Sequence, residues 1–176
     1  SDANCVKLMN AKPVLADCGS VDNWNITAES ISKVITKKTR AVVVVHYAGY
    51  PCDMQPIVDL CKKKNIYLIE DCAHAPGASI NGKFCGSWGD IGCFSFFTNK
   101  NLSVGEGGMT STKDPDIAKK LASLRSHGMT SLTLDRHKGR SSTYDVSEPG
   151  INYRMDEMRA ALGLVQLSKL KKANLA

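Results

Sequence analysis

The run A-V-V-V-V-H at residues 41–46 decides the fold that we expect for this chain of 176 residues. Consecutive β-branched residues without polar alternation indicate a strand buried on both faces of a parallel sheet. A second such run, I-Y-L-I-E-D at residues 66–71, follows a segment with helical periodicity at residues 54–64. Two parallel strands joined by a helix form a right-handed βαβ unit, which places His46 and Asp71 at the same carboxyl edge. The sequence therefore predicts an α/β fold with a mostly parallel sheet.

The chain returns to this sheet through an apolar run at residues 91–97 and then reaches Lys100 in a turn of polar residues. Gly105, Gly107 and Gly108 follow, so the backbone can approach a ligand closely. A lysine held between an apolar strand and such a loop is partly desolvated, which lowers its pKa and favours attack of its free amine on a carbonyl. A solvent-facing loop lysine is the alternative interpretation.

Asp71 and Lys100 together match what pyridoxal phosphate needs. Ligands of open α/β sheets bind beyond the carboxyl ends of the strands, where Asp71 is expected. The cofactor needs a lysine for its aldehyde, an acid for its pyridinium nitrogen and donors for its phosphate. Ser95, which precedes Lys100 by five residues, is a candidate phosphate donor. These residue types in this order predict a pyridoxal phosphate site.

Four motifs extend the argument over most of the chain. They are E-D-C-A-H-A-P-G-A (70–78), G-D-I-G-C-F-S-F-F-T-N-K-N-L-S-V-G-E-G-G (89–108), L-R-S-H-G (124–128) and G-I-N-Y-R-M-D-E-M-R-A-A-L-G-L-V-Q-L (150–167). In this order and spacing they resemble the DegT/DnrJ/EryC1/StrS family of sugar aminotransferases. The resemblance implies the aspartate aminotransferase fold, whose large domain is a three-layer sandwich that binds pyridoxal phosphate. It also implies transfer of an amino group from glutamate or glutamine to a nucleotide-linked ketosugar.

The resemblance assigns a role to each candidate residue. Lys100 binds the aldehyde of the cofactor and later moves the proton between substrate and cofactor. Asp71 keeps the pyridine nitrogen protonated, with a cap at the strand end as the alternative. His74 lies beside the cofactor ring or its phenolic oxygen, unless it is a structural histidine. Ser95 binds the phosphate, or else bonds its own backbone.

A second group of residues bears on substrates and on the neighbouring subunit. Asn152 resembles a family residue that reaches the phosphate of the other subunit's cofactor, which implies a homodimer with shared active sites. Arg154 is equally suited to that contact. His46 and Tyr47 either line the pocket for the sugar or the donor, or pack in the core. The basic segment 136–140 either grasps nucleotide phosphates or the donor carboxylate, or is a solvated run of charges.

One motif departs from the family pattern, in which H-P-T-K commonly precedes the glycines. This chain has F-T-N-K at residues 97–100, with the spacing of Asp71, Ser95 and Lys100 unchanged. The departure bears on the shape of the turn and on substrate preference. Lysine here favours amino transfer over the dehydratase branch of the family, where histidine replaces it. A sugar dehydratase and a non-catalytic regulatory or truncated relative are the alternative functions.

The length indicates part of a domain. A full member of this family is expected to be about twice as long, with a large cofactor domain and a smaller terminal domain. We therefore expect residues 1–176 to be part of the large pyridoxal phosphate-binding domain. The family's glycine-threonine phosphate loop and its C-terminal small domain are expected to lie outside this sequence.

Composition argues against several other classes of protein. The net charge of +6 is spread over separate lysine clusters without a nucleic-acid-binding motif, so no nucleic-acid partner is expected. The seven cysteines form no C-x-x-C pair and no metal-binding spacing with histidine, so we expect no metal site. They indicate reduced thiols in the cytoplasm, of which Cys72 could react slowly with oxidants because it adjoins the site. No apolar run reaches the roughly 20 residues of a membrane span.

Local signals predict the remaining elements. The expected strands, helices and hairpin turn lie at residues 13–17 and 108–112, at residues 27–37, 115–127 and 156–172, and at Asn81-Gly82. The last helix is expected to be amphipathic, with an apolar face formed by Met158, Ala161, Leu162, Val165 and Leu170. Residues 128–150 are predicted to form a long mobile loop.

Overall fold

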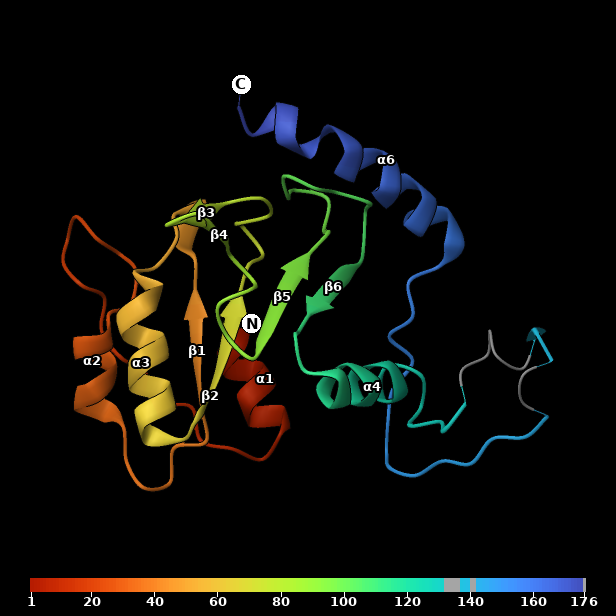
Figure 1. The fold of residues 1–176 in the computed structure, drawn as a ribbon, viewed down its shortest axis with the longest axis horizontal. Coiled ribbons are helices and arrows are strands. Elements are labelled where there is room, and N and C mark those ends of the chain that lie inside the picture. The colour runs from red at the N-terminus through yellow and green to blue at the C-terminus, as the bar shows by residue number, and fades with distance from the viewer. Residues whose placement is uncertain (132–136, 140–141, 176) are drawn as a thin grey trace.

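The structure, a computed structural model, describes residues 1–131, 137–139 and 142–175. A four-stranded sheet forms its centre (Figure 1), in the order β1 (Ala41–Val45), β2 (Tyr67–Asp71), β5 (Ile91–Ser95) and β6 (Gly108–Ser111). The first three strands run parallel, and β6 is antiparallel to β5. The predicted α/β fold with a mostly parallel sheet is confirmed. The carboxyl ends of β1, β2 and β5 therefore share one edge.

Two helices cover one face of this sheet. α2 (Ala28–Val34) begins after Thr27, whose side chain forms a reciprocal capping box with Ser30. It ends three residues earlier than the sequence predicted. α3 (Met54–Lys64) has the predicted bounds, and Asn65 ends it in the left-handed conformation.

The main hydrophobic core lies between α2, α3 and the sheet. Its buried residues come from the helices and from two strands, and include Val42, Val44, Ile57, Cys61 and Leu68. Val43 and Val45 point to the opposite face and are only half-buried. The prediction that β1 is buried on both faces is therefore wrong for this chain. The run of valines contains no polar residue from which the two faces could be told apart.

α1 (Asp2–Leu8) lies over that opposite face. The carboxyl group of Asp2 is close enough to that of Asp71 to interact with it, and Asp71 belongs to the face of Val43 and Val45. α1 thus adds the third layer of a helix–sheet–helix arrangement, although it buries none of its residues.

Short elements connect the strands of the central sheet. The short 3-10 helix η1 (Tyr47–Gly49) follows β1, and the hairpin of β3 (Ser79–Ile80) and β4 (Lys83–Phe84) follows β2. Asn81 and Gly82 have positive φ angles in the hairpin turn, as predicted. α4 (Pro115–Leu124) follows β6, and the Asp114 side chain accepts the N–H groups of Asp116 and Ile117.

α6 (Glu157–Ala173) begins at the cap residue Asp156 and crosses the carboxyl edge of the sheet (Figure 1). Only Leu170 of this helix is buried, whereas Met158 is 82% exposed, Val165 is 50% exposed and Leu162 is 46% exposed. The predicted apolar face therefore does not form against this chain. No helix among the described residues is long and apolar enough to cross a membrane.

Two other segments differ from the predictions or lie partly outside the described residues. Residues 13–17 form no strand, and β1 remains an edge strand that pairs with β2 alone among the described strands. In segment 128–150, Met129 and Val146 form a backbone bridge. Residues 132–136 and 140–141, with Arg136 and Arg140 of the basic segment, are not among the described residues.

Candidate active site

Asp71 ends β2 at the carboxyl edge of the sheet. Successive strand residues point to opposite faces, so Glu70 faces the core and Asp71 faces the other side. In register with Asp71, Cys93 lies on the neighbouring strand β5. The Oδ1 atom of Asp71 accepts the N–H of Ala73 at 2.8 Å. The strand-end cap is thus present. It holds the carboxylate through Oδ1, and the other oxygen, Oδ2, is not used in this hydrogen bond.

Ser95 ends β5 at the same edge. It follows Cys93 by two residues and therefore shares the face of Asp71. Its Oγ accepts the N–H of Phe97 at 3.3 Å. Because an accepting hydroxyl can still donate its own hydrogen, this bond leaves Ser95 able to bind a phosphate oxygen.

Lys100 lies in a loop closed by hydrogen bonds across residues 96–105. The N–H of Val104 donates to the Phe96 carbonyl at 2.9 Å, and the Thr98 hydroxyl donates to the Gly105 carbonyl at 3.0 Å. Phe96 and Val104 are buried in a small cluster with Leu102 and Leu170 of α6.

The Lys100 loop is also tied to α6 by a polar contact, in which the Gln166 side chain donates to the Ser103 carbonyl at 3.2 Å. The Lys100 side chain itself is half-buried. The structure thus places Lys100 in an anchored loop that leaves the carboxyl end of β5, directly beyond Ser95.

The remaining predicted residues separate into two places. His74 lies in the turn directly after β2 and is exposed. Asn152 pairs with Ser126 beyond the end of α4, which lies at the lower end of the sheet in Figure 1. Its side chain is exposed, as is that of Arg154. Asp71, His74, Ser95 and Lys100 therefore share one edge, and Asn152 lies away from it.

His46 does not line a pocket. It is fully buried, and its Nε2 atom lies 3.0 Å from Oε2 of Glu70. The packing interpretation therefore holds for His46. Tyr47 is 45% exposed, and its ring centroid lies 5.3 Å from that of Trp24.

The carboxyl group of Asp2 lies close enough to Asp71 for the two groups to interact. Burial raises the pKa of Asp2, and the negative charge of Asp71 raises it further. The two side chains therefore resist being ionised together. Nothing in the sequence signalled this contact, because the two residues lie far apart along the chain.

Glu70 is the other residue that the sequence analysis missed. An acid inside an otherwise apolar strand must be paired when it is buried, and this rule could have singled it out.

Cys72, beside Asp71, is fully buried, and burial raises the pKa of its thiol far above the ordinary value. Burial likewise raises the pKa of Cys52 to about 12. Since the thiolate is the reactive form, the structure argues against the expected oxidation of Cys72.

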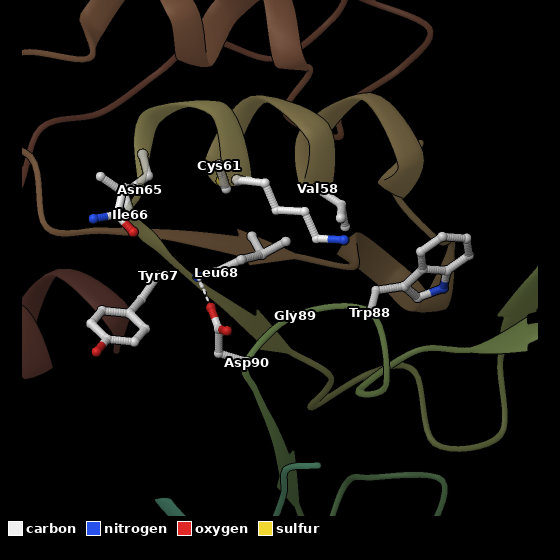
Figure 2. Close-up of a pocket in the computed structure, with 10 residues that line it drawn as sticks. Val58, Cys61, Asn65, Ile66, Tyr67, Leu68, Trp88, Gly89 and Asp90 are labelled. Atoms are coloured by element: carbon white, nitrogen blue, oxygen red, sulfur yellow. Dashed lines mark hydrogen bonds between the residues drawn. The ribbon is translucent and has the colours of Figure 1, made fainter. Parts of the chain in front are cut away.

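A hollow of about 310 Å³ lies at the amino end of β2, between α3 and the turn before β5 (Figure 2). Tyr67, Trp88 and Asp90 line it, and the Asp90 carboxylate accepts the N–H of Leu68 at 2.7 Å. This hollow is at the opposite edge of the sheet from Asp71. It is therefore separate from the candidate site.

The mostly parallel sheet with its covering helices matches part of the aspartate aminotransferase fold, the fold of pyridoxal phosphate-dependent aminotransferases. The chain belongs to the DegT/DnrJ/EryC1/StrS aminotransferase family, whose sequence model matches residues 1–175.

Three similar proteins illustrate the relationship. GDP-perosamine synthase of Escherichia coli O157:H7 is 38% identical over 169 residues, which are 96% of this chain and 44% of that protein. The structure of an aminotransferase from Psychrobacter cryohalolentis matches with a TM-score of 0.87 and 40% identity, over 96% of this chain and 43% of that chain. An aminotransferase of Helicobacter pylori involved in the biosynthesis of pseudoaminic acid matches with a TM-score of 0.86 and 31% identity, over 97% of this chain and 43% of that chain. The chain thus spans less than half the length of these relatives.

Proposed function

We propose that the protein containing this chain is a pyridoxal phosphate-dependent aminotransferase that acts on a nucleotide-linked ketosugar. The observation that carries the proposal is the placement of Asp71 and Ser95 at the ends of adjacent strands, on one face, with Lys100 in the loop beyond Ser95. Family membership supports it independently.

The side chains at this edge fit the cofactor. The carboxylate of Asp71 suits a pyridinium nitrogen, the hydroxyl of Ser95 suits a phosphate oxygen, and the amine of Lys100 suits the aldehyde. His74 would lie beside the ring. When bound, pyridoxal phosphate supplies an electron sink that stabilises negative charge at the substrate carbon.

The residues of this chain would then hold the cofactor in position and move protons. The Asp71 carboxylate, held by the Ala73 N–H, would keep a proton on the ring nitrogen through charge attraction. The amine of Lys100 would act as the base that takes a proton from the substrate carbon and returns it. The anchored loop would keep this amine within reach of the substrate carbon.

For the substrate, we propose a nucleotide-linked ketosugar as amino acceptor and glutamate or glutamine as donor. Two similar proteins, from Escherichia coli O157:H7 and Caulobacter vibrioides, are named GDP-perosamine synthase. A matched structure is that of an enzyme studied in the presence of its TDP-sugar product. These names support the sugar nucleotide, and the donor follows from the family resemblance.

We further propose a cytoplasmic homodimer in which Asn152 contacts the cofactor phosphate of the other subunit. The exposed side chain of Asn152, remote from Asp71 in its own chain, is compatible with a contact in the neighbouring subunit. All seven cysteines are unpaired, which suits a reducing compartment.

The test uses the complete protein loaded with pyridoxal phosphate. We expect an absorbance band above about 400 nm, and a pyridoxyl label on Lys100 after reduction with borohydride. Lys100→Ala should lose both, whereas Lys119→Ala, which removes an exposed lysine of α4, should keep both. A label absent from Lys100 in the wild type would refute the proposal.

The products then distinguish the alternative functions. Incubation with glutamate and a nucleotide-linked ketosugar should yield an aminosugar and 2-oxoglutarate in equal amounts. A deoxysugar without transferred nitrogen would indicate the dehydratase instead. A protein that never forms the absorbance band would be a non-catalytic relative.

A further inference from the structure

A buried polar network lies directly behind the candidate site. Glu70 precedes Asp71 on β2 and faces the opposite side of the sheet, and His46 follows β1. Both side chains are 0% exposed. A buried carboxylate is costly unless it is paired, so its partners show what it does.

Each oxygen of Glu70 accepts two hydrogen bonds. Oε1 accepts the N–H groups of Trp88 and Gly89, both at 2.7 Å. Oε2 accepts the N–H of Gly86 at 2.8 Å and contacts Nε2 of His46 at 3.0 Å. Burial opposes ionisation of Glu70, but these bonds outweigh it and hold the pKa of the carboxyl below its ordinary value.

His46 is oriented from its other side. The N–H of Cys52 donates to Nδ1 of His46 at 3.1 Å, so the ring proton of the neutral histidine lies on Nε2 and points at Glu70. The backbone N–H of His46 also donates to the carbonyl of Asp71 at 3.1 Å. His46 therefore holds the last two residues of β2 at once.

This network is not arranged as a metal centre. Candidate ligand atoms of His46, Glu70 and Cys72 lie within 4.8 Å of one another. The Glu70 oxygens and the Nδ1 atom of His46 already accept hydrogen bonds, and the Cys72 thiol is buried and resists ionisation. The lone pairs that a cation would need are engaged by the protein.

The three N–H groups held by Glu70 belong to residues 86–89, immediately before β5. Here the turn packs against β2 so closely that a Cβ on Gly89 would lie 2.5 Å from the Leu68 carbonyl oxygen. The next residue, Asp90, continues the contact through its N–H, which donates to the same oxygen at 2.8 Å. Glu70 therefore fixes where β5 begins along β2.

That starting point sets the position of the residues beyond β5. The register places Cys93 beside Asp71, and Ser95 and the Lys100 loop follow from it. A slip of one residue would turn Ser95 to the opposite face of the sheet. We propose that Glu70 and His46 are a positioning pair that holds Ser95 and Lys100 in place relative to Asp71. Its effect on catalysis rests on the proposed function.

The test compares two variants of the complete protein. Glu70→Gln keeps the shape but replaces one accepting oxygen with an NH₂ group, which must face N–H groups in either orientation. Ile57→Val is the matched control, because it weakens the same core at a fully buried position without touching the network. Hydrogen exchange is followed in residues 84–90 and 97–105, and reaction with the amino donor is followed by absorbance.

In Glu70→Gln we expect exchange in both segments to be about tenfold faster than in Ile57→Val. We expect kcat for the donor reaction to fall about 100-fold, because a misplacement of about 1 Å has an effect of this size. The donor KM should stay within about twofold, since Glu70 does not touch the donor. Equal exchange in the two variants, or an unchanged kcat, would overturn the proposal.

Failure of the proposed function would give a different result. If the wild type never reacts with an amino donor, that function is wrong, and exchange in residues 97–105 alone decides the positioning role. Faster exchange there in Glu70→Gln than in Ile57→Val supports it. No difference between the two variants rejects it.

Discussion

The carboxyl group of Asp2 lies close to that of Asp71 on the half-buried face of the sheet that α1 covers. Burial first, and the charge of Asp71 second, raise the pKa of Asp2. A carboxyl whose pKa is higher in the folded state makes folding less favourable once it ionises. The free energy of unfolding should therefore decline as the pH rises from the unfolded pKa of about 3.9 through the higher folded pKa.

We predict that Asp2→Asn removes this decline and makes the protein more stable than the wild type at pH 7. Urea unfolding of both proteins between pH 4 and pH 8 measures the free energy of unfolding as a function of pH. Parallel stability curves for the two proteins would show that the carboxyl groups do not interact.

Glu70 makes the free energy of unfolding depend on pH in the opposite direction. Hydrogen bonds hold its pKa below the ordinary value despite burial, so its ionised form stabilises the fold. This stabilisation is fully present above the unfolded pKa of about 4.3 and is lost as the pH falls through the lower folded pKa.

We predict that Glu70→Gln lowers the free energy of unfolding by about 3 kcal/mol at pH 7, because it leaves buried N–H groups and His46 without an ionised partner. The difference from the wild type should shrink below about pH 4.3. Chemical unfolding at pH 7 and pH 3.5 tests this, and a difference that is the same at both values would contradict it.

At the scale of elements, α6 is held to the Lys100 loop mainly through Leu170. Leu170 is 9% exposed and packs with Phe96, Leu102 and Val104. We predict that Leu170→Ala destabilises the protein by about 2 kcal/mol, at the low end for a core leucine because the cluster is small. Leu164→Ala, at a position that is 71% exposed, should change stability by less than about 0.5 kcal/mol.

The same pair of variants tests whether α6 anchors the loop. Hydrogen exchange in residues 97–105 should increase in Leu170→Ala and stay at the wild-type rate in Leu164→Ala. An unchanged loop in Leu170→Ala would mean that its backbone hydrogen bonds suffice without the helix.

Elements that carry their own signals could be predicted from the sequence. Asn65 ends α3, Asp114 and Asp156 cap their helices, and Asn81-Gly82 turns the hairpin, because each of these signals acts within a few residues. Residues 13–17 and the apolar residues of α6 were misjudged. Whether a strand pairs or a helix face is buried depends on partners distant in the sequence, which periodicity does not reveal.

The candidate site divides in the same way. Asp71 could be placed from the rule that ligands bind beyond the carboxyl ends of the strands, and Ser95 was singled out by its spacing from Lys100 and by the family resemblance. Two features of the site could not be predicted, because they depend on contacts between segments far apart in the chain. They are the hydrogen bonds between Glu70 and His46 and the contact of Asp2 with Asp71. From its place in the sequence, His46 could only be expected either to line a pocket or to pack in the core.

For the whole molecule, the proposed shared active site makes a prediction that separates Asn152 from Arg154. If Asn152 reaches the neighbouring subunit, a site needs Lys100 from one chain and Asn152 from the other. Lys100→Ala and Asn152→Ala homodimers should each be nearly inactive. A mixed dimer of the two variants would still contain one site with both side chains intact.

Random exchange of equal amounts of the two variants makes about half of the dimers mixed, each with one intact site of two, so about a quarter of the wild-type activity should return. Activity is measured before and after subunit exchange, with Lys100→Ala and Arg154→Ala mixed in the same way. Recovery only with Arg154→Ala, accompanied by an active Asn152→Ala homodimer, would move the contact to Arg154. Inactive homodimers that stay inactive after verified exchange would place both side chains in the site of one chain. That outcome would contradict the exposed position of Asn152 beyond α4, remote from the carboxyl edge where Lys100 lies.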